Sequence, residues 1–421
     1  MKARLACVLT AMGTALISLG CAGGAIEEPT GPLSSTDLLG VCPTPDRCGI
    51  MDMFGQWVFE PEYEWVPWRP EGSFAMKRLD QKVTLVDRSA RHMRVIETPH
   101  EGVPTRVSED RFAVRIRGYQ SPWMLLDMQG QRLGDLKLRW LQRSPQGSAG
   151  PLGAAVTRDA FTVSSGLIAG CTAEKQTIKD CGFITRDGQW WRTCPEPASF
   201  SEGLGTCGDS LLRADGSVLL EKVQLATGFS EGHAIARVSL PGESEDEMRE
   251  AWVILDTRGR VVVEFAQELG NKALSFREGR AVVRPGPQGK AFVDTAGAFY
   301  PAPAGTGVLD QLYEGLALYA PRKEGPWGYV DADGNVAIPP FASRPEHHED
   351  LANMRFSEGL AAARQPLAEG GRWGYIDREG TWVLGPVFER AEPFVRGIAR
   401  VRIDDRWTWV HTDGREILPA P

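Results

Sequence analysis

One short segment occurs twice near the C-terminal end of the chain, and its parts recur through most of the sequence. Residues 325–340 contain Gly-Pro-Trp-Gly-Tyr-Val-Asp-Ala-Asp-Gly-Asn-Val-Ala-Ile-Pro-Pro, and residues 371–386 follow the same pattern. The element Phe-Ser-Glu-Gly stands between the two copies, at residues 356–359. Such repetition constrains the fold strongly, because like units must adopt one internal structure and bury their apolar faces against one another.

Two markers of the repeat alternate along the chain. The first is an Asp-rich turn that ends in glycine or a substitute, and it occurs at Gly55, Ala90, Gly130, Gly188, Gly216, Gly259, Gly297, Gly334, Gly380 and Gly414. The second is a Glu-Gly or Arg-Gly pair after an aromatic residue, at Gly203, Gly232, Gly279, Gly315, Gly359 and Gly397. Because the two markers alternate in phase, they indicate about ten units of one kind.

Each unit has the sequence pattern of a small antiparallel sheet. Segments 252–256 and 291–294 are short and rich in aromatic and β-branched residues, as strands are. The Asp-x-x-Gly segment supplies a tight turn, since aspartate bonds its own backbone and glycine tolerates a positive φ. A strand such as 261–265 follows the turn, and another, such as 280–283, follows the Glu-Gly pair. We therefore predict an all-β chain of tandem antiparallel β-repeats with three to four strands in each unit.

Two arrangements of these units are compatible with the sequence. A propeller-like toroid would remove most open sheet edges, which otherwise invite aggregation. An open superhelix of stacked β-hairpins, ended by atypical caps, is the alternative, because the first and last repeats are eroded. We favour the toroid.

The repeated segments resemble the WG (Trp-Gly) β-repeat family of bacteria, on the strength of Trp327-Gly328 and Trp373-Gly374. The resemblance is close for residues 325–400, moderate for 181–300 and thin before 170, where Trp-Gly is missing. It implies an all-β repeat architecture and an exported or cell-surface location. It implies no defined activity.

The N-terminus has the features of an export signal. Lys2 and Arg4 precede an apolar run at 5–19, which is too short for a membrane-spanning helix. The segment that ends in Cys21 resembles the lipobox of bacterial lipoproteins, which implies lipidation of Cys21. An ordinary cleavable signal is the alternative. We expect a lipoprotein signal peptide at 1–20, a flexible tether at 21–40 and the β-repeat domain at 41–421.

These features predict an exported protein that is lipid-anchored in the bacterial cell envelope. Ala22 follows the lipidated position, and the sorting rule of enterobacterial lipoproteins then implies the outer membrane rather than the inner one. The net charge of −8 excludes a generally basic surface for nucleic acid. The expected membrane contact is therefore the N-terminal lipid.

Six cysteines remain after the signal and the lipidated residue are set aside. An even number in an exported chain predicts disulfides rather than free thiols. Local order favours three pairs, namely Cys42–Cys48, Cys171–Cys181 and Cys194–Cys207. No Cys-x-x-Cys pair occurs, which argues against a zinc site.

The sequence contains no recognisable catalytic or cofactor-binding motif, and we expect no cofactor. His347 and His348 lie among carboxylates in the longest insertion and are weak metal candidates; we expect this insertion to face solvent. Trp65 and Trp68 lie in a Pro-rich stretch and are candidates for partner binding, whereas Trp327 and Trp373 are expected to pack between units.

The repeated carboxylates have two interpretations. The Glu of each Glu-Gly pair could form a ring of carboxylates, but repetition in every unit favours a structural role in which each side chain accepts backbone N–H groups. We therefore predict a non-enzymatic binding or scaffold module for a protein or glycan partner. The alternative is an envelope hydrolase that uses paired carboxylates on a propeller-like scaffold.

Overall fold

The computed structural model describes residues 37–417 with interruptions. The interruptions lie at 45–46, 68–69, 71, 89–92, 109–110, 116–122, 142–166, 175–176, 195–199, 243–247, 271–272, 285–288, 323–324 and 345–347. The predicted signal peptide, Cys21 and most of the predicted tether therefore lie outside the described residues. The first strand begins at Leu38, so the folded part starts three residues before the predicted boundary at 41.

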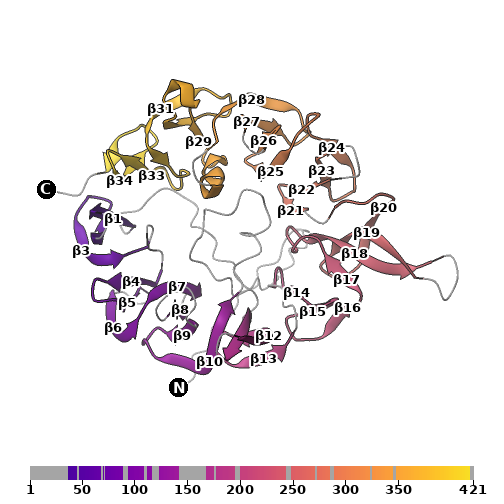
Figure 1. The fold of residues 1–421 in the computed structure, drawn as a ribbon, viewed down its shortest axis with the longest axis horizontal. Helices are drawn as coiled ribbons and strands as arrows, with labels where there is room; N and C mark the ends of the chain where they lie inside the picture. The colour runs from indigo at the N-terminus through magenta and orange to yellow at the C-terminus, as the bar shows by residue number, and fades with distance from the viewer. Residues whose placement is uncertain are drawn as a thin grey trace, which may run out of the picture.

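The strands form a ring of antiparallel sheets (Figure 1). We number the repeat units one to ten, each ending in the two strands that an Asp-type turn joins. Units one to four comprise β1 (Leu38–Thr44), β2 (Arg47–Asp52), β3 (Trp57–Trp65); β4 (Phe74–Arg78), β5 (Lys82–Asp87), β6 (Arg94–Glu101); β7 (Val103–Ser108), β8 (Arg111–Arg115), β9 (Trp123–Asp127), β10 (Arg132–Leu141); and β11 (Leu167–Glu174), β12 (Thr177–Thr185), β13 (Trp190–Thr193).

The later units have the same order of elements. Units five to seven comprise β14 (Leu204–Cys207), β15 (Ser210–Arg213), β16 (Val218–Leu220); β17 (Val223–Leu225), β18 (His233–Pro241), β19 (Met248–Asp256), β20 (Val261–Phe265); and β21 (Leu274–Arg277), β22 (Arg280–Val283), β23 (Ala291–Asp294), β24 (Phe299–Pro301). Units eight to ten comprise β25 (Val308–Tyr313), β26 (Leu316–Ala320), β27 (Trp327–Asp331), β28 (Val336–Ala342); β29 (Ala361–Arg364), β30 (Trp373–Ile376), β31 (Trp382–Phe388); and β32 (Arg390–Ala391), β33 (Ile398–Ile403), β34 (Arg406–His411), β35 (Glu416–Ile417).

The ten units form eight sheets in the described part of the chain, because four of them are fused in pairs. β3 is long enough to pair with β2 at one end and with β4 at the other, which makes one six-stranded sheet of units one and two. β10 joins β9 to β11 in the same way and makes the seven-stranded sheet of units three and four.

The core lies between neighbouring sheets. The middle strands are buried on both faces, as β26 is at all five positions, whereas the outermost strand β31 alternates between partly buried and exposed positions. A single apolar cluster joins units eight, nine and ten and contains Trp327, Trp373 and Val401. Each unit therefore depends on its neighbours for burial, as repeat architectures require.

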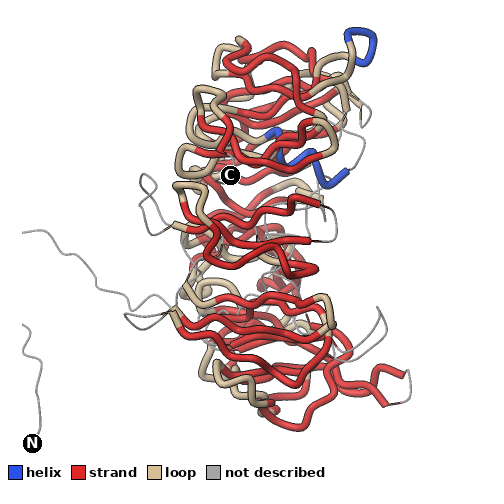
Figure 2. The backbone as a smooth tube through the Cα atoms, turned by 90° about the vertical axis from the view of Figure 1, so that its left-hand side faces the viewer, coloured by secondary structure: helices blue, strands red, loops and turns tan. Residues whose placement is uncertain are grey.

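The ring is closed between unit one and unit ten (Figure 1). Leu39 and Val41 of β1 lie in one buried cluster with Ile398 and Trp409 of the last unit. The indole Nε1 of Trp409 donates a hydrogen bond of 3.1 Å to the carbonyl oxygen of Gly40. These contacts confirm the predicted toroid, and the alternative of an open superhelix is wrong. Figure 2 shows the ring from the side, with the strands running across its thickness.

Two short 3-10 helices interrupt the β structure, η3 (His348–Met354) and η4 (Leu367–Glu369). No helix in the described residues is both long and apolar enough to cross a membrane. The expectation that the insertion around His348 faces solvent is wrong for its second half. Leu351 and Met354 are buried in the cluster that joins units eight to ten, because their apolar side chains fill space beside β29.

Candidate functional site

The two ends of the strands form two different faces of the ring. Two antiparallel strands separate the Glu-Gly turn of a unit from its Asp turn, so both turns lie at the same end of the unit. We call this end the turn face. The opposite end carries the connection between these two strands, such as the one between β29 and β30, and we call it the loop face.

The connections on the turn face are nearly uniform, whereas those on the loop face are not. The Asp turn leaves four residues between strands in eight units, five between β30 and β31, and six between β5 and β6. On the loop face the connections range from two residues between β33 and β34 to eight between β29 and β30. In repeat proteins, insertions collected on one face often mark the binding face.

The Asp turns are closed by their own carboxylates. Oδ1 of Asp294 accepts the backbone N–H groups of Ala296 and Ala298 at 3.0 and 2.9 Å, and Gly297 has a φ of 87°. Burial raises the pKa of Asp294, but hydrogen bonds from Ala298, Tyr300 and Ala296 lower it by a larger amount, so the pKa lies below its ordinary value. The same carboxylate-to-backbone pattern occurs at Asp52, Asp127, Asp256, Asp331 and Asp377. The aspartates therefore act as turn formers, as predicted.

The repeated glutamates form a ladder that links each unit to the next. The carboxylate of Glu278 accepts the backbone N–H groups of Glu314 and Gly315, both at 2.7 Å. The N–H groups of Glu278 and Gly279 in turn donate to the carboxylate of Glu231. The other glutamates of the ladder also accept backbone N–H groups of the following unit. The carboxylate of Glu202 accepts from Gly232, that of Glu314 from Glu358 and Gly359, and that of Glu358 from Arg396 and Gly397.

These bonds decide between the two interpretations of the repeated carboxylates. Each Glu of the ladder also has a positive φ, between 51° and 56°, so its side chain leans toward the following unit. Both oxygens of Glu278 are engaged by backbone donors of a neighbour. The glutamates therefore tie units together.

The ladder ends in a different interaction at the ring closure. Arg396 replaces glutamate in unit ten, and its guanidinium donates two hydrogen bonds to the carboxylate of Asp37, at 2.9 and 2.8 Å. Asp37 directly precedes β1, at the place where units five to nine have their Glu-Gly turn. The residue change thus replaces a carboxylate–backbone contact with an ion pair where unit ten meets unit one.

The Trp-Gly dipeptide has a packing role. The side chains of Trp327 and Trp373 are buried between units, as predicted. A Cβ on Gly328 would lie 2.5 Å from the carbonyl oxygen of Ile338, and Gly374 has the same close approach to Leu384. Only glycine allows the following strand to come this near, which explains why the dipeptide recurs.

The structure describes only one of the two tryptophan candidates for partner binding. Trp65 is half-buried at the end of β3, opposite Lys77 of β4. Trp68 lies outside the described residues. The structure therefore does not place the two indoles on one surface.

The cysteines lie near the loop face. Disulfides join Cys42 to Cys48 and Cys194 to Cys207. Cys181 is also disulfide-bonded, and Cys171 stands directly opposite it in the register of β11 and β12. The first bond staples two strands of unit one, and the second ties the end of unit four to unit five.

The metal candidates gain no structural support. His347 lies outside the described residues, as does the side chain of His348. Within the described residues no group of three or more His, Cys, Asp or Glu side chains is placed to hold a metal ion.

Sequence reasoning missed one buried polar cluster on the inner side of unit eight. Asp310 is 2% exposed and pairs with Arg355 at 2.7 and 3.1 Å, while Arg277 and Arg355 both stack on the ring of Tyr313. Burial raises the pKa of the Tyr313 hydroxyl. The signal in the sequence is a single aspartate inside the apolar strand β25. This cluster fixes the η3 insertion to the ring.

A closed ring of tandem antiparallel β units defines a propeller-like repeat protein. A family model of the WG containing repeat matches residues 49–82, 327–340 and 373–407. The chain therefore contains WG repeats, which confirms the resemblance seen in its sequence. One match lies before residue 170, where the Trp-Gly dipeptide is missing. No curated protein matches the chain.

Several solved structures are weakly similar. A eukaryotic initiation factor aligns with 11% identity and a TM-score of 0.46, over 90% of this chain and 94% of its own. BamB from Moraxella catarrhalis aligns with 11% identity and a TM-score of 0.30, over 90% and 96%. The computationally designed Ika8 protein has 9% identity and a TM-score of 0.36, over 73% and 94%. Because these TM-scores are all low, the similarities support neither the fold nor the function of this chain.

Proposed function

We propose that the chain is a non-enzymatic binding or scaffold module for a protein or glycan partner, and that it uses the loop face. The observation that carries this proposal is the contrast between the two faces. The turn face consists of nearly equal turns whose backbone donors are bonded by the chain's own carboxylates. The loop face carries connections of different length on a rigid ring, which is how repeat scaffolds present recognition surfaces.

The connection between β29 and β30 shows how such a surface is pre-ordered. The buried guanidinium of Arg364 donates to the carbonyl oxygens of Gly371 and Arg344, both at 2.8 Å. The C-cap residue Gly370 closes η4 with a backbone bond to Leu367. Leu367 nevertheless leaves 68% of its surface exposed. An exposed apolar side chain on an ordered loop loses little conformational entropy on binding, which favours affinity.

A matched pair of variants tests the use of the loop face. Leu367 on the loop face and Phe54 on the turn face are 68% and 73% exposed, so truncation of either should leave stability nearly unchanged. The bait is the chain with Cys21→Ser, presented to envelope extracts and to a glycan array. We expect Leu367→Ala to weaken capture of a specific partner and Phe54→Ala to leave it unchanged. Capture of neither protein nor glycan, or equal losses in both variants, would count against the proposal.

The envelope location is part of the same proposal. It is supported by the apolar run at 5–19 and the lipobox-like segment before Cys21. Two or three acyl chains on Cys21 would hold the ring on a membrane durably. We expect Cys21→Ser to move the protein from the membrane pellet to the soluble exported fraction. An unchanged membrane fraction would show that the lipid is not the anchor.

A further inference from the structure

The strand that closes the ring contacts its own unit on one side and the last unit on the other. Leu39 and Val41 of β1 face the cluster of Ile398 and Trp409 in unit ten. Leu38 and Cys42 face the core of units one and two. Among the described strands β1 pairs with β2 alone, so one ladder of hydrogen bonds holds the closing strand.

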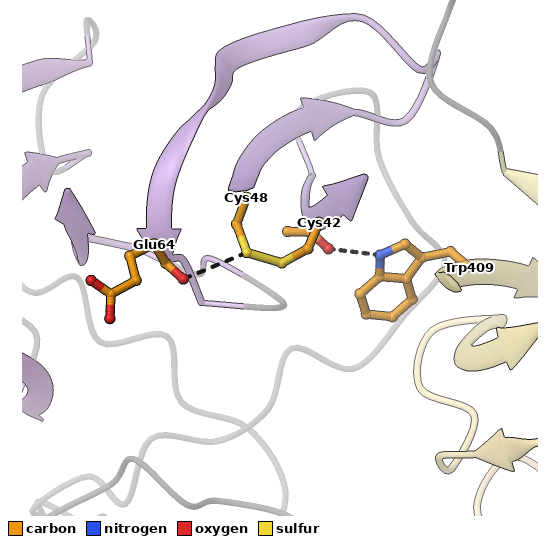
Figure 3. The surroundings of a disulfide bond; sticks show 5 residues. Cys42, Cys48, Glu64 and Trp409 are labelled. Carbon is orange, nitrogen blue, oxygen red and sulfur yellow. Dashed lines mark hydrogen bonds between the residues drawn. A yellow bond between two sulfur atoms is a disulfide. The ribbon is translucent and has the colours of Figure 1, made fainter. Parts of the chain in front are cut away.

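That ladder is regular over only part of its length. The pairing runs from Leu38 opposite Asp52 to Val41 opposite Gly49, and then the register shifts before Thr44. The disulfide between Cys42 and Cys48 lies at the shift and joins the two strands where their regular pairing ends. Figure 3 shows this disulfide beside Trp409, whose indole Nε1 donates to the carbonyl oxygen of Gly40.

The contacts that close the ring are therefore carried mainly by residues just before the disulfide. Asp37 binds Arg396, and the carbonyl oxygen of Gly40 binds Trp409. The apolar side chains of Leu39 and Val41 pack on unit ten. Both cysteine residues are buried, Cys42 at 9% and Cys48 at 3% exposure. Loss of the covalent bond would leave the pairing of β1 with β2 at four regular residue pairs next to an irregular segment.

We propose that the Cys42–Cys48 disulfide is a redox-dependent clasp of the ring. With the bond intact, β1 is fixed on β2 and holds unit ten. A dithiol supplies two electrons and two protons to the bond, which becomes two thiols, while the dithiol is oxidised to its own disulfide. In the reduced protein β1 separates from unit ten, and units two to nine stay folded, since each of them keeps both of its neighbours.

Hydrogen exchange followed by mass spectrometry on the full chain tests this proposal. In the variant Cys42→Ala/Cys48→Ala we expect backbone exchange in both β1 and β34 to rise about tenfold or more, with β26 and β27 unchanged. The matched control Cys194→Ala/Cys207→Ala removes a disulfide away from the closure and should leave β1 and β34 protected. Faster exchange in β1 alone, or equal effects of the two variants, would overturn the clasp.

A second measurement covers the case in which the first variant does not fold. The wild-type chain, folded under oxidising conditions, is incubated with dithiothreitol and followed by the same method. The proposal predicts that β1 and β34 lose protection together and before β26 and β27. Uniform loss across the chain, or unchanged protection of β34 after both cysteines of the first unit are reduced, would overturn it.

Discussion

The glutamate ladder gives a prediction whose magnitude follows from its geometry. Glu278 donates its backbone N–H to Glu231 and accepts two N–H groups of the next unit at 2.7 Å each. Glu278→Ala removes both accepted bonds and leaves the donated one. Hydrogen bonds to a charged group contribute about 1.5–3 kcal/mol when shielded, and less at an exposed turn. We therefore expect a loss of about 2 kcal/mol in the free energy of unfolding.

The variant Glu278→Gly distinguishes the stability that the hydrogen bonds contribute from the cost of the backbone conformation. Glu278 has a φ of 53°, in the left-handed region that costs a non-glycine residue about 1 kcal/mol. Glycine loses the same two bonds as alanine but removes this cost, so its net loss should be only about 1 kcal/mol. The expected order of stability is wild type, then Glu278→Gly, then Glu278→Ala.

Two assays measure this order. Urea unfolding gives the overall change, and hydrogen exchange at the N–H groups of Glu314 and Gly315 gives the local one. A loss of 2 kcal/mol corresponds to about thirtyfold faster local exchange. Wild-type stability in Glu278→Ala would refute the role of the ladder. A glycine variant less stable than the alanine variant would refute the assignment of backbone strain.

Three further predictions concern single positions. Gly328→Ala should destabilise the protein by about 2 kcal/mol or more in urea unfolding, because the new Cβ would meet the carbonyl oxygen of Ile338 at 2.5 Å; wild-type stability would contradict this close approach. Asp310→Ala should cost about 3–5 kcal/mol and lower the melting temperature, since it leaves the Arg355 guanidinium buried without its carboxylate, and a change under 1 kcal/mol would argue against the pair. Burial raises the pKa of Asp294, but hydrogen bonds lower it by more, so the ionised carboxylate stabilises the fold above pH about 4 and loses this effect as the pH falls through the folded pKa. Asp294→Asn should therefore be less stable than wild type at pH 7 and equally stable in acid. A difference in stability that does not change with pH would contradict the lowered pKa.

The local structure of a unit was predictable because each marker has a local cause. The Asp turns form from an aspartate that bonds its own backbone, and segments such as 261–265 and 280–283 are strands with the predicted bounds. The bonding of the glutamates to backbone N–H groups was also predictable as a type of interaction, because the same residue recurs at the same place in each unit. The partner of each glutamate was not predictable, since the turn of the next unit is 30 to 48 residues away.

The sequence favours closure of the ring but cannot establish it. Closure depends on the summed rotation between each unit and the next, which decides whether unit ten meets unit one. No local sequence pattern encodes this sum. Arg396 was visible as the exception among the Glu-Gly pairs, yet Asp37 lies in a segment with no repeat marker. The fusion of sheets through β3 and β10 was missed for a similar reason, because a strand shared by two units removes the boundary that the repeat predicts. The buried pair of Asp310 and Arg355 joins segments from two different units.

A double-mutant cycle on Asp37 and Arg396 tests the closed ring most directly, because the two residues are 359 positions apart and meet only at the closure. Their side chains are 21% and 14% exposed and form two hydrogen bonds, so the coupling free energy should be about 1–2 kcal/mol. The cycle comprises Asp37→Ala, Arg396→Ala and the double variant, with stability measured by urea unfolding. A coupling of this size would place the first and last units in contact in solution. Additive effects of the two substitutions would contradict a closed ring.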